Sequence, residues 1–169
     1  MLASIIFSAV VGTVAGTASV VDADTLEIRG ERIRLAGVDA PESGQKCRDA
    51  SANFFRCGSI AANALDTWIN RASVSCDIEG KDRYGRLLGH CKVRGQSMQE
   101  WLVLNGYAVA YRSYSTAYVP AELAARSAGA GIWAGEFVMP WDWRQGLRLE
   151  GEKPTKAMIS GKFASNGGR

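Results

Sequence analysis

The chain has 169 residues, of which 47% are hydrophobic and 22% are charged, and its formal net charge is +3. This composition is that of a globular protein with a sizeable core, and it excludes a disordered or fibrous chain. The charge is uneven, because six basic residues and two acidic ones follow from Arg144 onward. We expect residues 146–169 to form a basic tail, either flexible and solvated or able to hold a polyanion loosely.

The first 21 residues contain no charged side chain. Residues 1–16 are apolar and end in small residues, which is typical of an export signal, although the usual basic start is missing. An N-terminal anchor and a purely structural strand are the alternatives. Several glycine and threonine residues make a stable membrane span unattractive, and we expect none.

Alternating apolar residues predict four strands. The segments 14–28 and 31–38 form a first hairpin around the turn "RGE", and the segments 72–78 and 87–93 form a second pair around "EGKDRYGR". An antiparallel sheet throughout, with helices interspersed, indicates an α+β fold built on a small barrel.

Helical spacing predicts three helices. The first covers 51–70, with Gly58 as an early weak point. The second starts at Ser97, which has capping-box spacing to Glu100, and stops near Gly106. The third begins at Pro120, because proline suits a first helical turn.

The four cysteines, Cys47, Cys57, Cys76 and Cys91, are even in number and can pair in three ways in an oxidising compartment. No CxxC motif is present, and the lone histidine makes no zinc-ligand cluster. Cys76 and Cys91 flank a turn and would face each other across a hairpin, which leaves Cys47 with Cys57. Four free thiols packed as small apolar groups are the alternative.

Four carboxylates lie near the ends of the first two predicted strands. Asp22 and Asp24 are two residues apart, so their side chains share one face of an extended strand. Asp39 and Glu42 follow in the stretch "GVDAPES". If the two strands pair, these oxygens converge at one end of the sheet, where they would suit Ca²⁺. Without a cation the like charges would raise one another's pKa.

Two arginines accompany the carboxylates. Arg34 precedes Asp39 by five residues, and Arg86 follows the second turn. A guanidinium group holds phosphoryl oxygens better than an ammonium group does, although ordinary ion pairs are the alternative. Two arginines, a divalent cation and a carboxylate that activates water are a complete set for phosphodiester hydrolysis.

The segments "VVDADTLEI", "RIRLAGVDAPES", "DRYGRLLG" and "LVLNGYAVAY" resemble the staphylococcal (thermonuclease-like) nuclease family in order and in approximate spacing, over about residues 17–135. The stretch "PWDWR" resembles the ending of bacterial relatives, so we expect the domain to span 17–145. The resemblance implies an OB-fold, a five-stranded antiparallel β-barrel with three α-helices. It also implies Ca²⁺-dependent cleavage of DNA and RNA.

The resemblance also implies roles for individual residues. Asp24 and Asp39 would bind the metal through their side chains and Ala40 through its carbonyl, with Asp22 supporting the metal ligands. Arg34 and Arg86 would bind the phosphate and stabilise its transition state, and Glu42 would act as the general base or position the attacking water.

Some substrate-binding positions match the family and others depart from it. Arg83 and Tyr84 match a basic and an aromatic residue, and Tyr84 would offer a stacking surface for a nucleotide. Tyr111 matches the first of two tyrosines, but the second falls at Ser113, next to Tyr114. Departures are also Ala40 in place of a threonine and Ala23 in place of a glycine.

We therefore expect a monomeric, disulfide-bonded nuclease that is periplasmic or secreted. A non-catalytic OB-fold module that binds nucleic acid is the first alternative. A protein associated with the envelope or with exopolysaccharide is the second.

Overall fold

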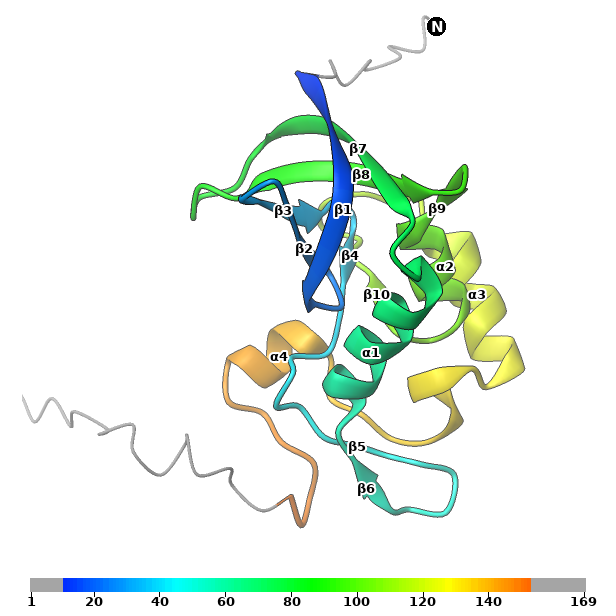
Figure 1. Ribbon diagram of the computed structural model, residues 1–169. Helices are drawn as coiled ribbons and strands as arrows, with labels where there is room; N and C mark the ends of the chain where they lie inside the picture. Colours follow the sequence, from blue (N-terminus) through cyan, green and yellow to red (C-terminus); the bar gives the residue numbers. More distant parts are fainter. Residues whose placement is uncertain (1–10, 153–169) are drawn as a thin grey trace, which may run out of the picture.

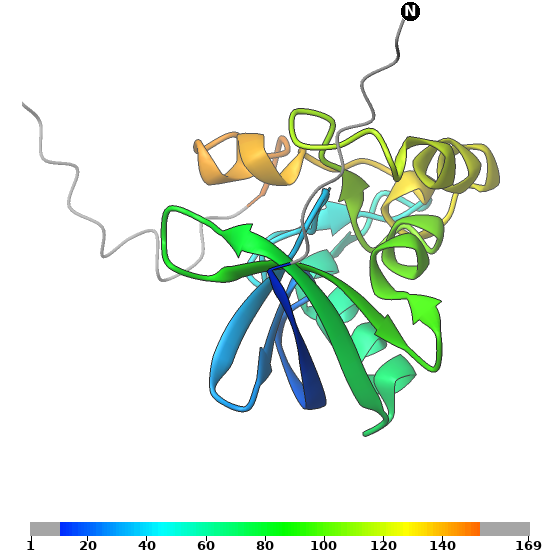
Figure 2. The ribbon, with the colours of Figure 1, turned by 90° about the horizontal axis from the view of Figure 1, so that it is seen from above.

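The computed structural model describes residues 11–152, which form a closed barrel with helices packed at one end and along one side (Figures 1 and 2). The strands are β1 (Gly12–Asp22), β2 (Thr25–Ile28), β3 (Glu31–Leu35), β4 (Val38–Asp39), β5 (Cys47–Arg48), β6 (Phe54–Phe55), β7 (Ser73–Lys81), β8 (Leu87–Val93), β9 (Gln96–Ser97) and β10 (Val109–Ala110). The helices are α1 (Cys57–Ile69), α2 (Met98–Leu104), α3 (Val119–Ala128), the 3-10 helix η1 (Gly131–Ala134) and α4 (Pro140–Arg144).

Five strands close the barrel in the order β3-β2-β1-β7-β8, and β3 then pairs with β8. The predicted α+β OB-fold is confirmed, but the prediction of an antiparallel sheet throughout is wrong at the closing pair, where β3 and β8 run parallel. This pairing joins strands more than fifty residues apart, so no local turn signal announces it.

The first predicted hairpin is in fact two hairpins. The segment 14–28 is broken by a tight turn at Ala23 and Asp24, and Asp22 pairs with Thr25 across that turn. Strand β1 begins at Gly12 and pairs with β7 from its first residue. The barrel therefore includes residues 12–16, which the export prediction had assigned to the N-terminal segment. Residues 1–10 lie outside the described part of the chain.

The first helix begins later than its apolar spacing predicts. Residues 51–56 form a turn and the short strand β6, and α1 starts at Cys57. The Asp49 carboxylate accepts the backbone N–H groups of Ser51 and Asn53, which fixes a turn where the helix was expected. The second helix is as predicted, since the Ser97 hydroxyl accepts the backbone N–H of Glu100.

Both predicted disulfides are confirmed. Cys76 and Cys91 are directly opposite each other on β7 and β8, with Cα atoms 4.0 Å apart. Cys47 and Cys57 join β5 to the start of α1. Cys76 and Cys91 belong to the barrel core, whereas the other pair lies in a second apolar cluster with Val109.

The second apolar cluster matters for the site because it carries the segment that leads to α4. Trp133, Phe137 and Trp141 pack against it. The short helix α4, which the expected set of three helices did not include, is held at the open end of the barrel by this packing (Figure 1). No helix within residues 11–152 has the length and apolarity to cross a bilayer.

Candidate active site

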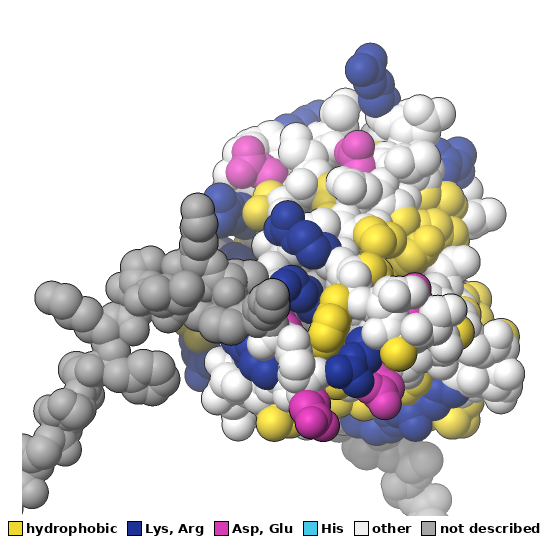
Figure 3. Space-filling model, turned by 90° about the horizontal axis from the view of Figure 1, so that it is seen from below, with side chains coloured by type: hydrophobic (Ala, Val, Ile, Leu, Met, Phe, Trp, Pro, Cys, Tyr) yellow, Lys and Arg dark blue, Asp and Glu magenta, His cyan; other side chains and the backbone are white. Residues whose placement is uncertain are grey.

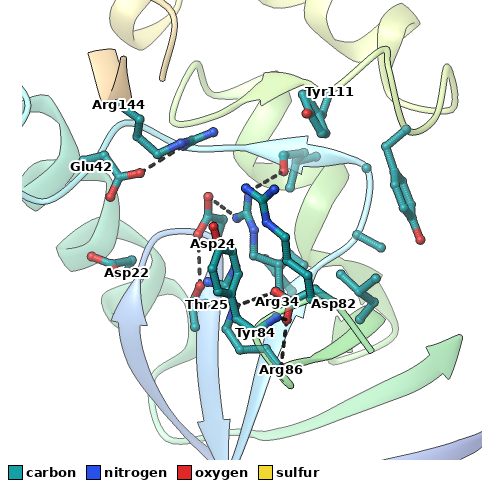
Figure 4. A pocket seen from close by; sticks show the side chains of 17 residues that line it. Asp22, Asp24, Thr25, Arg34, Glu42, Asp82, Tyr84, Arg86, Tyr111 and Arg144 are labelled. Carbon is teal, nitrogen blue, oxygen red and sulfur yellow. Dashed lines mark hydrogen bonds and ion pairs between the residues drawn. The ribbon is translucent and has the colours of Figure 1, made fainter. Parts of the chain in front are cut away.

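A cleft of about 460 Å³ lies between the β7–β8 hairpin and α4, which are on the same side of the molecule in Figures 1 and 2. Its charged and aromatic lining is Asp22, Asp24, Arg34, Glu42, Asp82, Arg83, Tyr84, Arg86, Tyr111, Tyr114 and Arg144 (Figure 4). Of the predicted site residues, only Asp39 and Ala40 do not line the cleft. Both are buried beside it, and Asp39 is bonded to Arg34.

Asp22 and Asp24 reach the cleft from the end of β1 and from the turn that follows it, and not from one face of a single strand. Asp24 lies in the β1–β2 turn, where its oxygens accept the backbone N–H of Ala40 at 2.9 Å and the hydroxyl of Thr25 at 3.1 Å. Asp22 ends β1 and faces the same cavity. Burial, and then the neighbouring charges of Asp24 and Glu42, raise the pKa of Asp22. The carboxylates thus converge as predicted, but by a different local geometry.

Arg34 joins the two predicted metal-binding aspartates. Its guanidinium pairs with Asp24 and, at 2.9 Å, with Asp39. Burial opposes the charged guanidinium, but the two carboxylates outweigh burial and raise the pKa of Arg34. The alternation of β3 directs this side chain toward the cleft while Ile33 and Leu35 enter the core. The guanidinium group of Arg34 is therefore held in place before any ligand binds.

The β7–β8 turn carries the second arginine. The Asp82 carboxylate accepts the Nε–H of Arg86 at 2.7 Å and the backbone N–H groups of Tyr84 and Arg86. Burial tends to raise the pKa of Asp82, but these hydrogen bonds lower it. The Tyr84 ring is 69% exposed, and the guanidinium groups of Arg83 and Arg86 lie 4.9 and 5.6 Å from its centroid. The turn thus presents an accessible ring between two cations.

The loop that carries Glu42 is fixed from two sides. The Gln45 amide accepts the backbone N–H of Glu42 and donates to the carbonyl of Val138 at 2.6 Å, although Gln45 is fully buried. The Glu42 carbonyl also lies against Gly58, where an added Cβ would be 1.8 Å from it. The glycine that the sequence marks as a weak point in a helix therefore allows the loop to rest directly on α1.

Sequence reasoning placed Arg144 in the C-terminal basic segment and missed its position in the site. Its guanidinium pairs with both oxygens of Asp39, at 3.0 and 2.8 Å, and with Glu42 at 2.9 Å. These hydrogen bonds, with the charge of Asp39, raise the pKa of Arg144 against the effect of burial. The stretch "PWDWR" contained the residue, but nothing in the chain order connects it with Asp39, 105 residues away.

Two tyrosines, Tyr111 and Tyr114, also line the cleft. Tyr111 packs its ring 5.7 Å from that of Trp141 on α4. Ser113, which stands at the position of the family's second tyrosine, does not line the cleft. The neighbouring Tyr114 does, and it supplies the second tyrosine. Its hydroxyl donates to Glu79, and burial together with this carboxylate raises the pKa of Tyr114 to about 12.

The candidate donor atoms are oxygens, the type of ligand atom that a hard divalent cation binds. Asp24, Asp39 and the Ala40 carbonyl supply oxygen, and Asp22, whose pKa is raised first by burial and then by the charges of Asp24 and Glu42, adds a further carboxylate nearby. The arrangement, however, pairs these carboxylates with arginines. Within residues 11–152 no three carboxylate, imidazole or thiolate groups are gathered as ligands. The oxygen donors are thus of the kind that Ca²⁺ accepts, but in this structure Arg34 pairs with Asp24 and Asp39, and Arg144 pairs with Asp39 and Glu42.

This barrel, with carboxylates and arginines at its open end, defines a small α+β protein of OB-fold type. The model of the family described as "Staphylococcal nuclease homologue" matches residues 32–135. The chain belongs to the staphylococcal nuclease family.

Three relatives illustrate the range of the similarity. The succinoglycan biosynthesis protein ExoI of Rhizobium meliloti (strain 1021) is 42% identical over 72% of this chain and 65% of its own length. An uncharacterized endonuclease of Escherichia coli O157:H7 is 32% identical over 74% and 80%. The probable staphylococcal-like nuclease CAN4 of Oryza sativa subsp. japonica is 31% identical over 71% and 23%. The chain thus spans less than two thirds of the first and third of these proteins.

Proposed function

We propose that the protein is a Ca²⁺-dependent nuclease that hydrolyses phosphodiester bonds of DNA and RNA. The observation that carries the proposal is that Arg34, Arg86 and Glu42 line one cleft although they come from separate elements. Family membership and the nuclease names of two relatives support it. An oxidising compartment, periplasmic or extracellular, agrees with the two disulfides. The export signal and the monomeric state remain predictions.

The arginines have the properties that phosphate binding needs. Each is held by a carboxylate, Arg34 by Asp24 and Asp39 and Arg86 by Asp82, so neither has to be ordered when the substrate binds. Their planar forks can donate to the oxygens of a phosphodiester, and they stabilise best a transition state that gains negative charge there. Arg83 and the exposed ring of Tyr84 would contact the neighbouring nucleotide.

Glu42 is the proposed acceptor of the water proton. As the water oxygen bonds to phosphorus, its proton passes to the carboxylate, the bond to the leaving oxygen breaks, and that oxygen takes a proton from solvent. Asp24, Asp39 and the Ala40 carbonyl would hold Ca²⁺, and Asp22 would support them. The bound ion would supply Lewis-acid polarisation of the phosphate.

Nucleic-acid binding should depend on salt concentration. On the face shown in Figure 3, Lys and Arg side chains are interspersed with acidic and apolar ones rather than gathered in one basic field. Nucleic-acid affinity is therefore expected to be modest and to fall with ionic strength, as phosphate contacts are replaced by salt.

The test compares hydrolysis by the wild type with that by Arg34→Ala and Arg86→Ala. Loss of a transition-state arginine is expected to lower the rate by about 10²-fold or more. Folded variants that retain full activity would contradict the proposal. A folded wild type that binds single-stranded DNA without cutting it would support the binding module instead.

The similarity to a succinoglycan biosynthesis protein favours a second candidate, a role in exopolysaccharide biology. That name belongs to the relative, and no residue of the described cleft selects a sugar. Processing of a purified glycan, with no cleavage of DNA or RNA, would be needed to support this candidate.

A further inference from the structure

Arg144 forms ion pairs with Asp39 and Glu42, two carboxylates on which the proposed chemistry depends. Its two terminal nitrogens donate to both oxygens of Asp39. One of them also donates to Glu42 (Figure 4). Asp39 is fully buried, and its Oδ1 also accepts a hydrogen bond from Arg34. Every oxygen of this aspartate therefore faces a guanidinium group within the described structure.

Arg144 can leave these partners without disturbing the core. It is the last residue of α4, and its side chain is 41% exposed. The helix itself is held elsewhere, by Trp141 in the second apolar cluster and by the ring of Tyr111. A change of side-chain rotamer would suffice to move the charge into solvent, whereas Arg34 is only 14% exposed and is held between two carboxylates.

The charges favour an exchange of occupants. Among the described residues, Arg34 and Arg144 are the cations that pair directly with Asp24, Asp39 and Glu42, whereas Arg86 is paired with Asp82 and affects Asp22 through its charge. Arg34 and Arg144 both contact Asp39, so a cation that approaches this carboxylate would be repelled by both guanidinium groups, of which Arg144 is the more exposed. A divalent cation can bind Asp39 only if it displaces Arg144.

We propose that Arg144 and the divalent cation are alternative occupants of Asp39, so that Arg144 sets the cation concentration at which the site loads. The inference rests on the proposed function for the presence of a cation site. It makes Arg144 a determinant of metal loading, and it frees Glu42 for its role as base only when the cation is bound.

The test is calorimetric titration of Ca²⁺ into the full chain without substrate. Arg144→Gln removes the competing charge and keeps the length, and its dissociation constant for Ca²⁺ should fall by about tenfold or more. Arg144→Lys keeps the charge but loses the bidentate geometry, so it should bind Ca²⁺ with intermediate affinity. Arg32→Gln is the matched control, because Arg32 is 61% exposed and pairs with Glu27, and neither residue lines the cleft; its affinity should match that of the wild type.

A second measurement uses the wild type and does not depend on a variant being stable. The Nε–H signal of the Arg144 side chain is assigned by its absence in Arg144→Gln and is followed by NMR as Ca²⁺ is added. It should change as the site fills and become that of a solvated guanidinium. A signal unchanged at saturation would overturn the inference, and so would equal or weaker Ca²⁺ binding by Arg144→Gln.

The outcomes separate this inference from the proposed function. Tight Ca²⁺ binding by Arg144→Gln with no hydrolysis by any form would uphold the competition and remove the nuclease. Hydrolysis with no Ca²⁺ binding by wild type or variant would refute the competition and leave the nuclease.

Discussion

The Gly58→Ala substitution has two opposing effects on stability, and they differ in size. Gly58 is the second residue of α1, where alanine ordinarily stabilises a helix by about 0.5–1 kcal/mol over glycine. Here the added Cβ would lie 1.8 Å from the carbonyl oxygen of Glu42 and 2.7 Å from that of Pro41. Carbon and oxygen normally approach no closer than about 3.3 Å, so the loop must shift by roughly 1.5 Å.

The steric effect should prevail. Overpacking of this kind costs about 1–3 kcal/mol, so Gly58→Ala should lose about 1–2 kcal/mol of stability. The Tm should fall by about 2–8 °C, measured by circular dichroism. A displacement of about 1 Å in a catalytic group can cost about 10²-fold in rate, so hydrolysis of single-stranded DNA should fall comparably.

The control for Gly58→Ala is Gly80→Ala. An added Cβ at Gly80 meets no atom within 4 Å, and that variant should change stability by no more than about 0.5 kcal/mol and leave hydrolysis intact. If Gly58→Ala had a Tm at or above that of the wild type and retained its activity, the argument that α1 positions the Glu42 loop would fail.

Three further predictions concern the surroundings of the cleft. Asp82→Asn removes the charge that orients Arg86, and kcat/KM on single-stranded DNA should fall about tenfold with little change in Tm; an unchanged rate would mean that Arg86 orients itself. Glu122→Ala leaves the buried N–H of Ala110 without its acceptor and should cost about 2 kcal/mol in urea unfolding, whereas a cost near zero would show that water replaces it. Tyr114 keeps its proton to about pH 12 in the native state but loses it near pH 10 when unfolded, so the free energy of unfolding should decline between these values. Tyr114→Phe should reduce this decline, and an identical pH profile for both proteins would refute the assignment.

The local motifs predicted which residues gather at the cleft better than they predicted the strands and turns that carry them. Alternation and capping located most strands and the second helix, and the family resemblance brought Asp24, Arg34, Asp39 and Arg86 to one place. The break in the first strand was missed although Asp22 and Asp24 are residues that favour turns, because apolar β-forming residues continue on both sides of the turn. The parallel closure of β3 on β8 was missed because it depends on how the barrel closes, and not on a neighbouring sequence.

Arg144 shows the limit most clearly. From the sequence, Arg144 counts only as the first basic residue of the C-terminal segment, whereas in the structure it ends α4, which packs through Trp141. The contact that matters joins Arg144 to Asp39 across 105 positions, and it exists only because the second apolar cluster carries α4 back to the barrel. Long-range tertiary contacts of this kind leave no periodicity in the sequence.

The most direct test of the central claim is hydrolysis of single-stranded DNA by the purified, oxidised protein with Ca²⁺, with Mg²⁺ and with a chelator, alongside Arg86→Ala. We predict cleavage with Ca²⁺ that is lost with the chelator and reduced about 10²-fold or more in the variant. A folded protein that cleaves nothing under any of these conditions, or an Arg86→Ala protein as active as the wild type, would contradict the account.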